Sequence, residues 1–204
     1  MTSRRLVLSV LCSAALLCGL ALSTTPWAQP VAENAPAYTA DGRLQFPAAY
    51  RKWVYLTSGF DMSYLPSPLR PFSTFGNVFV NPQAYDAFIE NGTWPDKTVL
   101  VLEVRRAEQE ASINRNGRSQ GDIVRTEVHL KDNARFGGWA FFAFADENPS
   151  PMIPRTANCY SCHEEHAAVD TTFVQFYPTL LAIARTKNTL TAHYLAEEAN
   201  AARK

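Results

Sequence analysis

The sequence predicts a fold of the α+β class, with strands concentrated in the middle of the chain and short helices on either side. Residues 98–144 contain three segments rich in Val, Leu, Ile and aromatic residues, the composition typical of strands. Before and after this region, apolar residues recur at helical spacing in short stretches. Thirteen Pro, nine Gly and 12% aromatic residues argue against a bundle of long helices or a coiled coil.

Length and charge limit the classes of protein to consider. The chain has 204 residues, which fits one domain, and 47% of them are apolar, enough to bury a core. Its 19 Lys and Arg balance 19 Asp and Glu, so the formal net charge is zero. No basic field is therefore present to hold nucleic acid, and we expect no nucleic-acid partner.

The first 28 residues have the layout of a secretory signal peptide. Arg4 and Arg5 precede an apolar stretch from Leu6 to Leu22, and small residues and Pro follow at once. An uncleaved membrane anchor is the alternative, because the apolar stretch approaches a spanning length. We expect a cleaved signal over residues 1–28, a linker or loosely held N-terminal arm over 29–45, a folded domain over 46–204, and export to the periplasm.

The first half of the domain mixes helix, loop and strand. Residues 47–57 show a short helical pattern, and Pro66, Pro68 and Pro71 then predict an open loop. Residues 78–80 predict a strand. A helix should follow over 82–91, with Asn81 as its cap, Pro82 in its first turn and Gly92 at its end.

The second half begins with strands and ends with helices. Residues 98–104, 122–130 and 139–144 predict strands, and the polar stretch 108–121 predicts a hairpin loop between the first two. Two helical stretches close the chain, the last of them capped by Thr191.

The residues with the clearest chemistry are Cys159-Tyr160-Ser161-Cys162-His163. This is the Cys-x-x-Cys-His motif through which c-type haem is attached. On one helical turn the thiols of Cys159 and Cys162 reach the two porphyrin vinyl groups, and His163 lies beneath the iron as its proximal ligand. The motif predicts one covalently bound haem c for each chain. Export agrees with this, since bacteria complete the attachment outside the cytoplasm.

Two other uses of the cysteines are open. Cys159, Cys162, His163 and His166 have zinc-ligand chemistry, although zinc sites usually separate their cysteine and histidine halves by a loop. The pair also has the spacing of a thioredoxin-like redox site, but that site normally follows an early β–α unit. Haem attachment explains the adjacent histidine better than either alternative.

An open sixth position on the iron is expected. His166 lies three residues past His163, on the proximal side, and cannot reach the far face of the haem. The other side chains able to ligate iron there are Met62, Met152, His129 and His193, and no Met follows Cys162 as it does in electron-transfer cytochromes c. An open position indicates the binding of a small molecule or catalysis.

An ordered set of segments carries further information about the domain. The segments are residues 50–54, 78–82, 98–99, 128–132, 135–136, 138–142 and 159–163, together with Asp170, Phe173 and 175–178. Over about residues 44–182 this set resembles the cytochrome P460 family together with its sibling, the β-sheet cytochrome c′ (c′-beta). The resemblance implies a small antiparallel sheet flanked by short helices, the haem motif on a C-terminal helix, one five-coordinate c-haem and a homodimer.

One departure favours the c′-beta type. In the hydroxylamine-oxidising members a lysine on the first long strand is cross-linked to the porphyrin, and by the resemblance that position is Leu102 here. Lys97 is an unsuitable substitute, because five residues along a strand place it on the opposite face. We expect Leu102, Phe75 and Phe79 to form an apolar distal roof suited to nitric oxide or carbon monoxide. A distal cation is also expected to be missing, because Gly76 occupies the place of an arginine in some cross-linked members.

Three functions therefore compete. The leading prediction is a periplasmic cytochrome that binds small gases, since an apolar pocket admits diatomic molecules and disfavours charged ones. Oxidation of hydroxylamine or a peroxidase-like reaction is the enzymatic alternative, with Glu127 as the acid–base residue. The competing interpretation of Glu127 is a surface residue paired with Arg125 or Lys131. Simple electron transfer with a periplasmic redox partner is the third, and requires a strong sixth ligand.

Overall fold

The computed structural model describes residues 34–64, 71–109 and 112–203, all within a compact unit that spans Val31–Lys204. The predicted signal peptide and the start of the predicted arm lie outside the described residues. Among those described, no helix is both long enough and apolar enough to cross a membrane.

A single antiparallel sheet forms the centre of this unit. Its strands follow the chain in the order β1-β2-β3-β4-β5, so each strand pairs with its neighbours in sequence. The strands are β1 (Val54–Phe60), β2 (Thr74–Val80), β3 (Val99–Glu108), β4 (Ser119–Asp132) and β5 (Gly138–Phe144). The predicted α+β class and the antiparallel sheet are confirmed.

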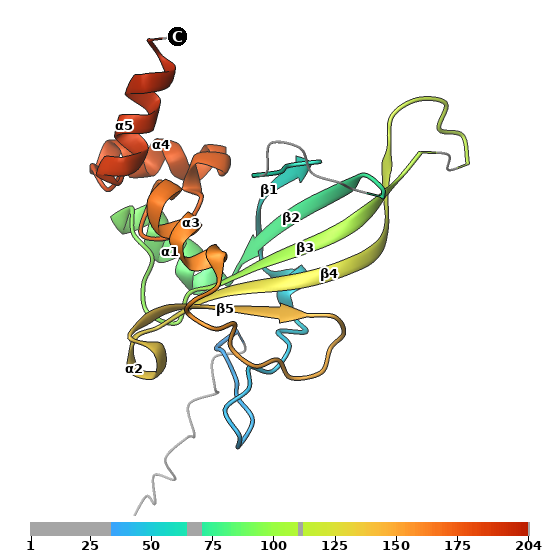
Figure 1. The fold of residues 1–204 in the computed structure, drawn as a ribbon, viewed down its shortest axis with the longest axis horizontal. Coiled ribbons are helices and arrows are strands. Elements are labelled where there is room, and N and C mark those ends of the chain that lie inside the picture. The colour runs from blue at the N-terminus through green and yellow to red at the C-terminus, as the bar shows by residue number, and fades with distance from the viewer. Residues whose placement is uncertain (1–33, 65–70, 110–111, 204) are drawn as a thin grey trace, which may run out of the picture. The chain divides into compact units, whose positions relative to one another are not determined.

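Short helices surround the sheet. They are η1 (Tyr50–Lys52), α1 (Pro82–Asn91), α2 (Asn133–Phe136), α3 (Asn158–His166), η2 (Val174–Phe176), α4 (Pro178–Lys187) and α5 (Ala192–Ala201). Helices α1, α3, α4 and α5 gather at one end of the sheet, and the β3–β4 connection lies at the other end (Figure 1).

The predicted helix ends are largely confirmed. Gly92 ends α1 with a φ of 74°, the left-handed conformation that glycine adopts without strain. The hydroxyl of Thr191 caps α5 by accepting from the Tyr194 amide at 3.2 Å. Asn81 occupies the cap position of α1, but its side chain does not cap the helix. Its Oδ1 accepts instead from the Val99 amide at 2.8 Å, which ties the helix to the start of β3.

The helical pattern predicted over residues 47–57 is wrong for most of its length. Only Tyr50–Lys52 form a turn of 3₁₀ helix, and the chain then becomes β1. Val54, Tyr55 and Thr57 are β-branched or aromatic residues that favour an extended chain beside a partner strand. A bulge between Tyr55 and Thr57 shifts the pairing with β2, which hides the alternation expected of a strand.

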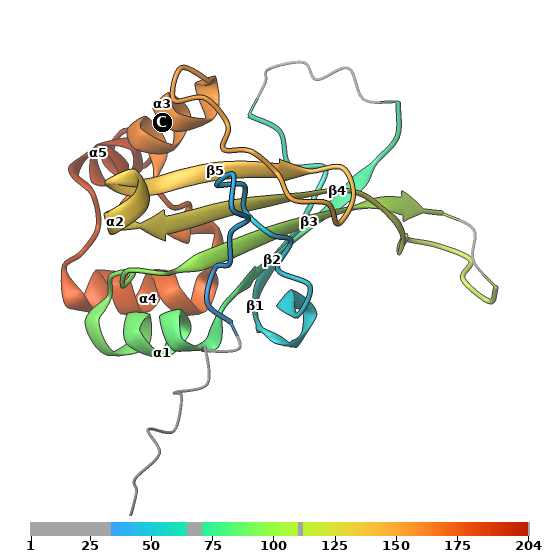
Figure 2. The same cartoon turned by 90° about the horizontal axis from the view of Figure 1, so that it is seen from below.

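The two faces of the sheet carry different residues and cover different parts of the fold. Alternate residues of β3 give one face Leu100, Leu102 and Val104, here called the cavity face. The other face, here called the arm face, carries Val99 and Val101. Residues 34–53 lie against the arm face (Figure 2). There the backbone of Leu44 pairs with that of Tyr38 and that of Ser150. The described part of the predicted arm is therefore fixed to the sheet and is not a loose linker.

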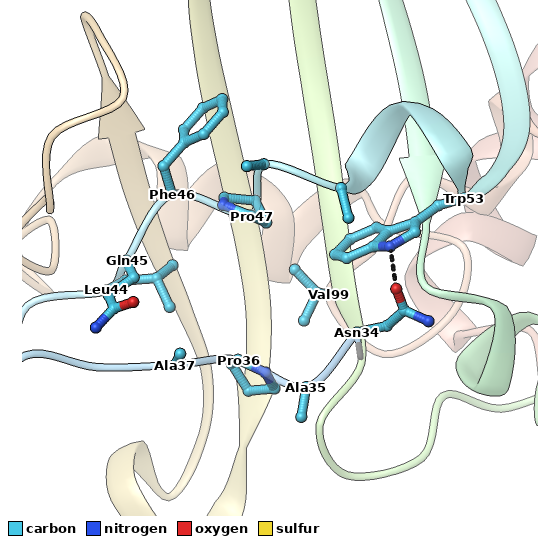
Figure 3. Close-up of a pocket in the computed structure, with 12 residues that line it drawn as sticks. Asn34, Ala35, Pro36, Ala37, Leu44, Gln45, Phe46, Pro47, Trp53 and Val99 are labelled. Carbon is cyan, nitrogen blue, oxygen red and sulfur yellow. Dashed lines mark hydrogen bonds between the residues drawn. The ribbon is translucent and has the colours of Figure 1, made fainter. Parts of the chain in front are cut away.

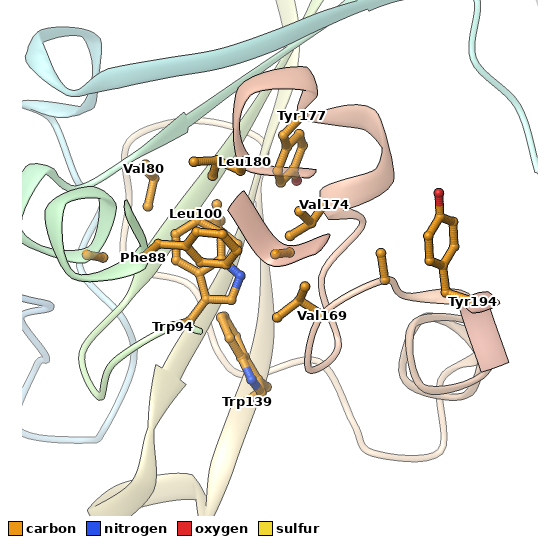
Figure 4. Packing of buried hydrophobic residues seen from close by; sticks show 13 residues of the cluster. Val80, Phe88, Trp94, Leu100, Trp139, Val169, Val174, Tyr177, Leu180 and Tyr194 are labelled. Carbon is orange, nitrogen blue, oxygen red and sulfur yellow. The ribbon is translucent and has the colours of Figure 1, made fainter. Parts of the chain in front are cut away.

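A second apolar cluster holds the helices against the sheet (Figure 4). Phe88 of α1 is fully buried, and its ring lies 4.3 Å from that of Trp94. Val80, Leu100, Val174 and Leu180 extend the cluster between strands, η2 and α4. This packing fixes the segment after α3, which carries part of the candidate site.

The arm face also buries a charged residue. Glu103 is 3% exposed and accepts hydrogen bonds from Tyr50 Oη at 2.5 Å, Arg51 Nη2 at 2.8 Å and Arg105 Nε at 2.5 Å. Burial alone would raise the pKa of Glu103, but the donors from Arg105, Tyr50 and Arg51 outweigh it and lower this pKa to about 2. The carboxylate therefore stays ionised and links η1 to β3.

Candidate functional site

The candidate site is a cavity of about 720 Å³ on the cavity face of the sheet. Its volume lies in the range of roughly 300–1,000 Å³ usual for ligand and cofactor pockets. Strands β1 to β5 supply one side of it, and α3, η2 and the segment that joins β1 to β2 supply the rest.

The cysteine–histidine motif opens into this cavity. Cys159, Cys162 and His163 all lie on α3 and all line the cavity. Spacings of three and four residues place them on one side of the helix, as the motif predicts. Neither cysteine forms a disulfide, and burial raises the pKa of the Cys162 thiol.

His163 is held in one tautomer. Its Nδ1 lies 2.7 Å from the backbone carbonyl oxygen of Thr171, which only accepts hydrogen bonds. Nδ1 therefore carries the proton, and the lone pair is on Nε2. Burial lowers the pKa of His163, with the bond to Thr171 opposing it in part, so the ring is neutral at pH 7. Phe173 stacks on this ring at 4.1 Å.

The sheet places Leu102 and Glu127 side by side in the cavity wall. They are direct partners across β3 and β4, and both line the cavity. Gly76 is in the same wall, where an added Cβ would lie only 3.1 Å from a methyl group of Leu102. Glycine at this position allows Leu102 to lie close against β2.

Glu127 is both a cavity residue and a paired residue. Its carboxylate accepts from Arg125 Nε at 2.5 Å, and both side chains line the cavity while remaining about half exposed to solvent. The pairing with Arg125 is thus the surface interaction considered from the sequence, whereas Lys131 binds Asp170 instead. Arg125 also brings a cation to a cavity for which the sequence predicted none.

The placement of Phe75 and Phe79 corrects the predicted distal roof. Phe75 pairs with Arg105 and Phe79 with Val101, so both side chains lie on the arm face, away from Leu102. The Phe79 ring contacts that of Tyr50 at 5.6 Å. The β2 residues that do line the cavity are Thr74, Gly76 and Val78, because side chains alternate along a strand.

The fold places some of the other histidines and methionines in the cavity and the rest away from it. Met62 and His129 line the cavity, whereas Met152 packs in the arm-face cluster and His193 is an exposed residue of α5. His166 is also exposed and contacts Glu197 of α5, as expected for a residue outside the cavity.

Lys97 precedes β3 and pairs with Asp132, so it does not stand in for a lysine at position 102.

A zinc site gains no support. The described residues contain no group of three or more His, Cys, Asp and Glu arranged to hold a metal ion. Tyr64, Phe141 and Tyr177 also line the cavity. They come from three separate segments, and nothing in the sequence predicted that these side chains meet in one cavity.

A smaller pocket of about 270 Å³ lies on the arm face, between residues 34–37, residues 44–49, Trp53 and Val99 (Figure 3). The indole of Trp53 donates to Asn34 Oδ1 at 2.6 Å across it. Its lining has no thiol, imidazole or charged side chain, so the chemistry of the motif belongs to the larger cavity alone.

The family to which the chain belongs follows from its match to a family model. The model of the family "Cytochrome P460" matches residues 47–174, from η1 through α3 to the start of η2. The chain belongs to the cytochrome P460 family. No curated protein matched the sequence. Membership implies that the chain is a mono-haem cytochrome.

The cavity fits a cytochrome P460 haem in its donor set. Two thiols and one neutral imidazole with its lone pair on Nε2 open into a space whose walls are mainly apolar. Cys159 and Cys162 have the chemistry to hold the porphyrin edge, and His163 has that of an axial ligand. Leu100, Leu102 and Val104 of β3 offer the flat apolar surface that a porphyrin requires.

Proposed function

We propose that this member of the cytochrome P460 family is an exported c-type cytochrome whose sixth iron position is open and binds small gases such as nitric oxide or carbon monoxide. One observation carries the proposal. Cys159, Cys162 and His163 open together into a cavity that also contains Leu102, the position of the cross-linking lysine in hydroxylamine-oxidising members.

The haem would be covalent, with one group for each chain. Cys159 and Cys162 would hold it as thioethers, since each thiol S–H can add across one vinyl group of the porphyrin without an oxidant. When bound, the haem supplies an iron that changes its charge by one electron and accepts a diatomic ligand. His163 Nε2 would hold the iron, with the ring oriented by the hydrogen bond from Nδ1 to the carbonyl of Thr171.

Apolar walls support the binding of gases. Val78, Leu100, Leu102 and Val104 come from adjacent strands and line one continuous part of the cavity. Such a surface gives no hydrogen bonds to a charged substrate, whereas a diatomic gas requires none. Leu102 also lacks the amine that a cross-link needs, which supports the c′-beta type over the hydroxylamine oxidases.

Oxidation of hydroxylamine is the second candidate, and the position of Glu127 favours it. The carboxylate lies in the cavity wall beside Leu102, where a proton acceptor would serve such a reaction. Its pairing with Arg125 opposes this role, because a proton taken up by Glu127 would weaken that ion pair. Simple electron transfer would require a cavity residue such as Met62 to ligate the iron.

The remaining parts of the proposal rest on the sequence and the family resemblance. Export depends on the signal predicted over residues 1–28, and an exported cytochrome would meet its redox partner in the periplasm. The homodimer depends on the resemblance alone.

The first test is covalent attachment. The mature protein should stain for haem on a denaturing gel, and Cys159→Ala combined with Cys162→Ala should abolish the stain. His163→Ala should retain the stain and change the absorption spectrum, because the thioethers remain while the axial bond is lost. A stain that persists in the double variant would contradict attachment through these thiols.

The second test separates the candidate functions. Spectra of the ferrous protein are recorded with and without carbon monoxide. Shifted bands are expected and indicate an open position, whereas unchanged bands would indicate a six-coordinate electron carrier. A broad, red-displaced Soret band in the untreated protein would indicate a cross-link and support the enzyme instead.

A further inference from the structure

The loop after α3 is built as a rigid turn. Val169 and Thr172 pair with each other, with the Thr172 amide donating to the Val169 carbonyl at 2.9 Å. Asp170 between them has a φ of 52°, a left-handed conformation uncommon for a residue with a side chain. The Thr172 hydroxyl accepts from Trp94 Nε1 at 2.7 Å and donates to the Val169 carbonyl at 2.7 Å.

Thr171, inside this turn, contacts two histidines. Its carbonyl oxygen accepts from His163 Nδ1 at 2.7 Å, and its hydroxyl oxygen lies 3.3 Å from His129 Nε2. One residue thereby connects the imidazole of the motif on α3 with an imidazole on β4. The ring centroids of His129 and His163 lie 5.0 Å apart.

The imidazole of His129 is fixed by its neighbours and can therefore fix the position of Thr171. It belongs to β4, is 8% exposed, and its ring stacks on Phe141 at 4.0 Å with 11° between the planes. Trp139 contacts the same ring at 4.3 Å. Both aromatic residues are on β5, the strand paired with β4, so the sheet itself fixes the position of the imidazole.

Lys131 binds Asp170, the residue of the turn that precedes Thr171. It lies two positions after His129 on β4, and side chains two positions apart point to the same face. Its Nζ donates to Asp170 Oδ2 at 3.1 Å and to the Trp94 carbonyl at 2.8 Å. Alternate residues of one strand therefore hold consecutive residues of the turn.

We propose that His129 is a positioning residue for His163, a role that rests on the proposed function of His163 as an iron ligand. By fixing Thr171, His129 sets the direction and length of the bond from His163 Nδ1 to the Thr171 carbonyl. A strong acceptor at Nδ1 makes the ring more electron-rich at Nε2 and favours the oxidised, more highly charged iron. Without His129, Thr171 loses one of its fixed contacts, and the hydrogen bond from His163 Nδ1 to its carbonyl becomes weaker. The equilibrium between ferric and ferrous iron then shifts toward the ferrous form.

The test compares four variants of the haem-loaded protein. His129→Phe keeps a planar ring between Trp139 and Phe141 but removes the polar contact with Thr171. Thr171→Ala removes the hydroxyl and keeps the carbonyl. His129→Gln restores a group able to hydrogen-bond the hydroxyl, and His166→Phe is the matched control on the exposed histidine.

Haem staining, the ferrous iron–histidine stretching frequency and the reduction potential are measured for each variant. With staining unchanged, His129→Phe and Thr171→Ala should lower the frequency and shift the reduction equilibrium about tenfold toward ferrous iron, a rise of about 59 mV for one electron. His129→Gln should recover most of the shift, and His166→Phe should show none.

The possible results distinguish a failure of the role proposed for His129 from a failure of the proposed function. Wild-type frequency and potential in both His129→Phe and Thr171→Ala, with haem attached, would overturn the role of His129, as would an equal shift in His166→Phe. If His129→Phe does not fold, Thr171→Ala decides, because it leaves the stacked rings in place. A wild-type protein without haem would instead overturn the proposed function.

Discussion

Acidification should destabilise the fold through Glu103, the carboxylate buried on the arm face. Its folded-state pKa of about 2 lies below the ordinary value of 4.5, because Arg105, Tyr50 and Arg51 donate to it. At about 1.4 kcal/mol for each pH unit between the two values, this difference corresponds to about 3 kcal/mol. A depressed pKa stabilises the folded state above the unfolded value, so the contribution is present at pH 7 and is lost as pH falls from about 4.5 toward 2.

The variant Glu103→Gln isolates this contribution. The amide keeps the size and an acceptor oxygen, but it leaves Arg51 and Arg105 without their shared anion. We expect the free energy of unfolding, measured by urea titration at pH 7, to fall by about 3 kcal/mol. The wild-type protein should lose stability more steeply than the variant between pH 4.5 and pH 2.5.

A matched control is Glu147→Gln, which changes an exposed glutamate in the connection between β5 and α3. Its free energy of unfolding should stay within about 0.5 kcal/mol of the wild-type value. Equal acid sensitivity in wild type and Glu103→Gln would refute the argument, since it would mean that the buried carboxylate gains nothing from its three donors.

Two further predictions concern the cavity wall. Leu102→Lys places an amine beside Glu127. When hydrogen peroxide is added as a two-electron oxidant, mass spectrometry of haem peptides should detect a third bond between protein and porphyrin in this variant. The wild type should show only the two thioethers and negligible hydroxylamine turnover. A third bond in the wild type would support the enzyme. Phe79→Ala should cost about 2 kcal/mol of stability, because the partly buried ring packs on Tyr50, yet leave carbon monoxide affinity within about twofold. A large loss of affinity would contradict the assignment of Phe79 to the arm face.

The error at Phe75 and Phe79 shows what a strand pattern leaves undecided. Alternation along β2 separates its residues into two sets, but it does not say which set shares a face with Leu102. That choice depends on register, and the pairing of Val78 with Leu102 places Val78 and Gly76 in the cavity. Register between strands is a property of the folded sheet.

The first strand was missed for a related reason. The segment from Trp53 to Thr57 has apolar residues at positions that fit a helix as well as a bulged strand. Its strand conformation depends on pairing with β2, whose residues lie about 20 positions further along the chain. Tertiary pairing here overrides a weak local pattern.

The sequence by itself determined the features that act within one element. The spacing of Cys159, Cys162 and His163 places them together on any helix, Gly92 ends a helix because it tolerates a positive φ, and Thr191 begins one through its hydroxyl. Only the tertiary structure decided that Thr171 meets His129 across 42 positions and that Tyr50 meets Glu103 across 53. Such contacts depend on how strands pair and helices pack, and the free energy that selects them is distributed over the whole core and marked in no short segment.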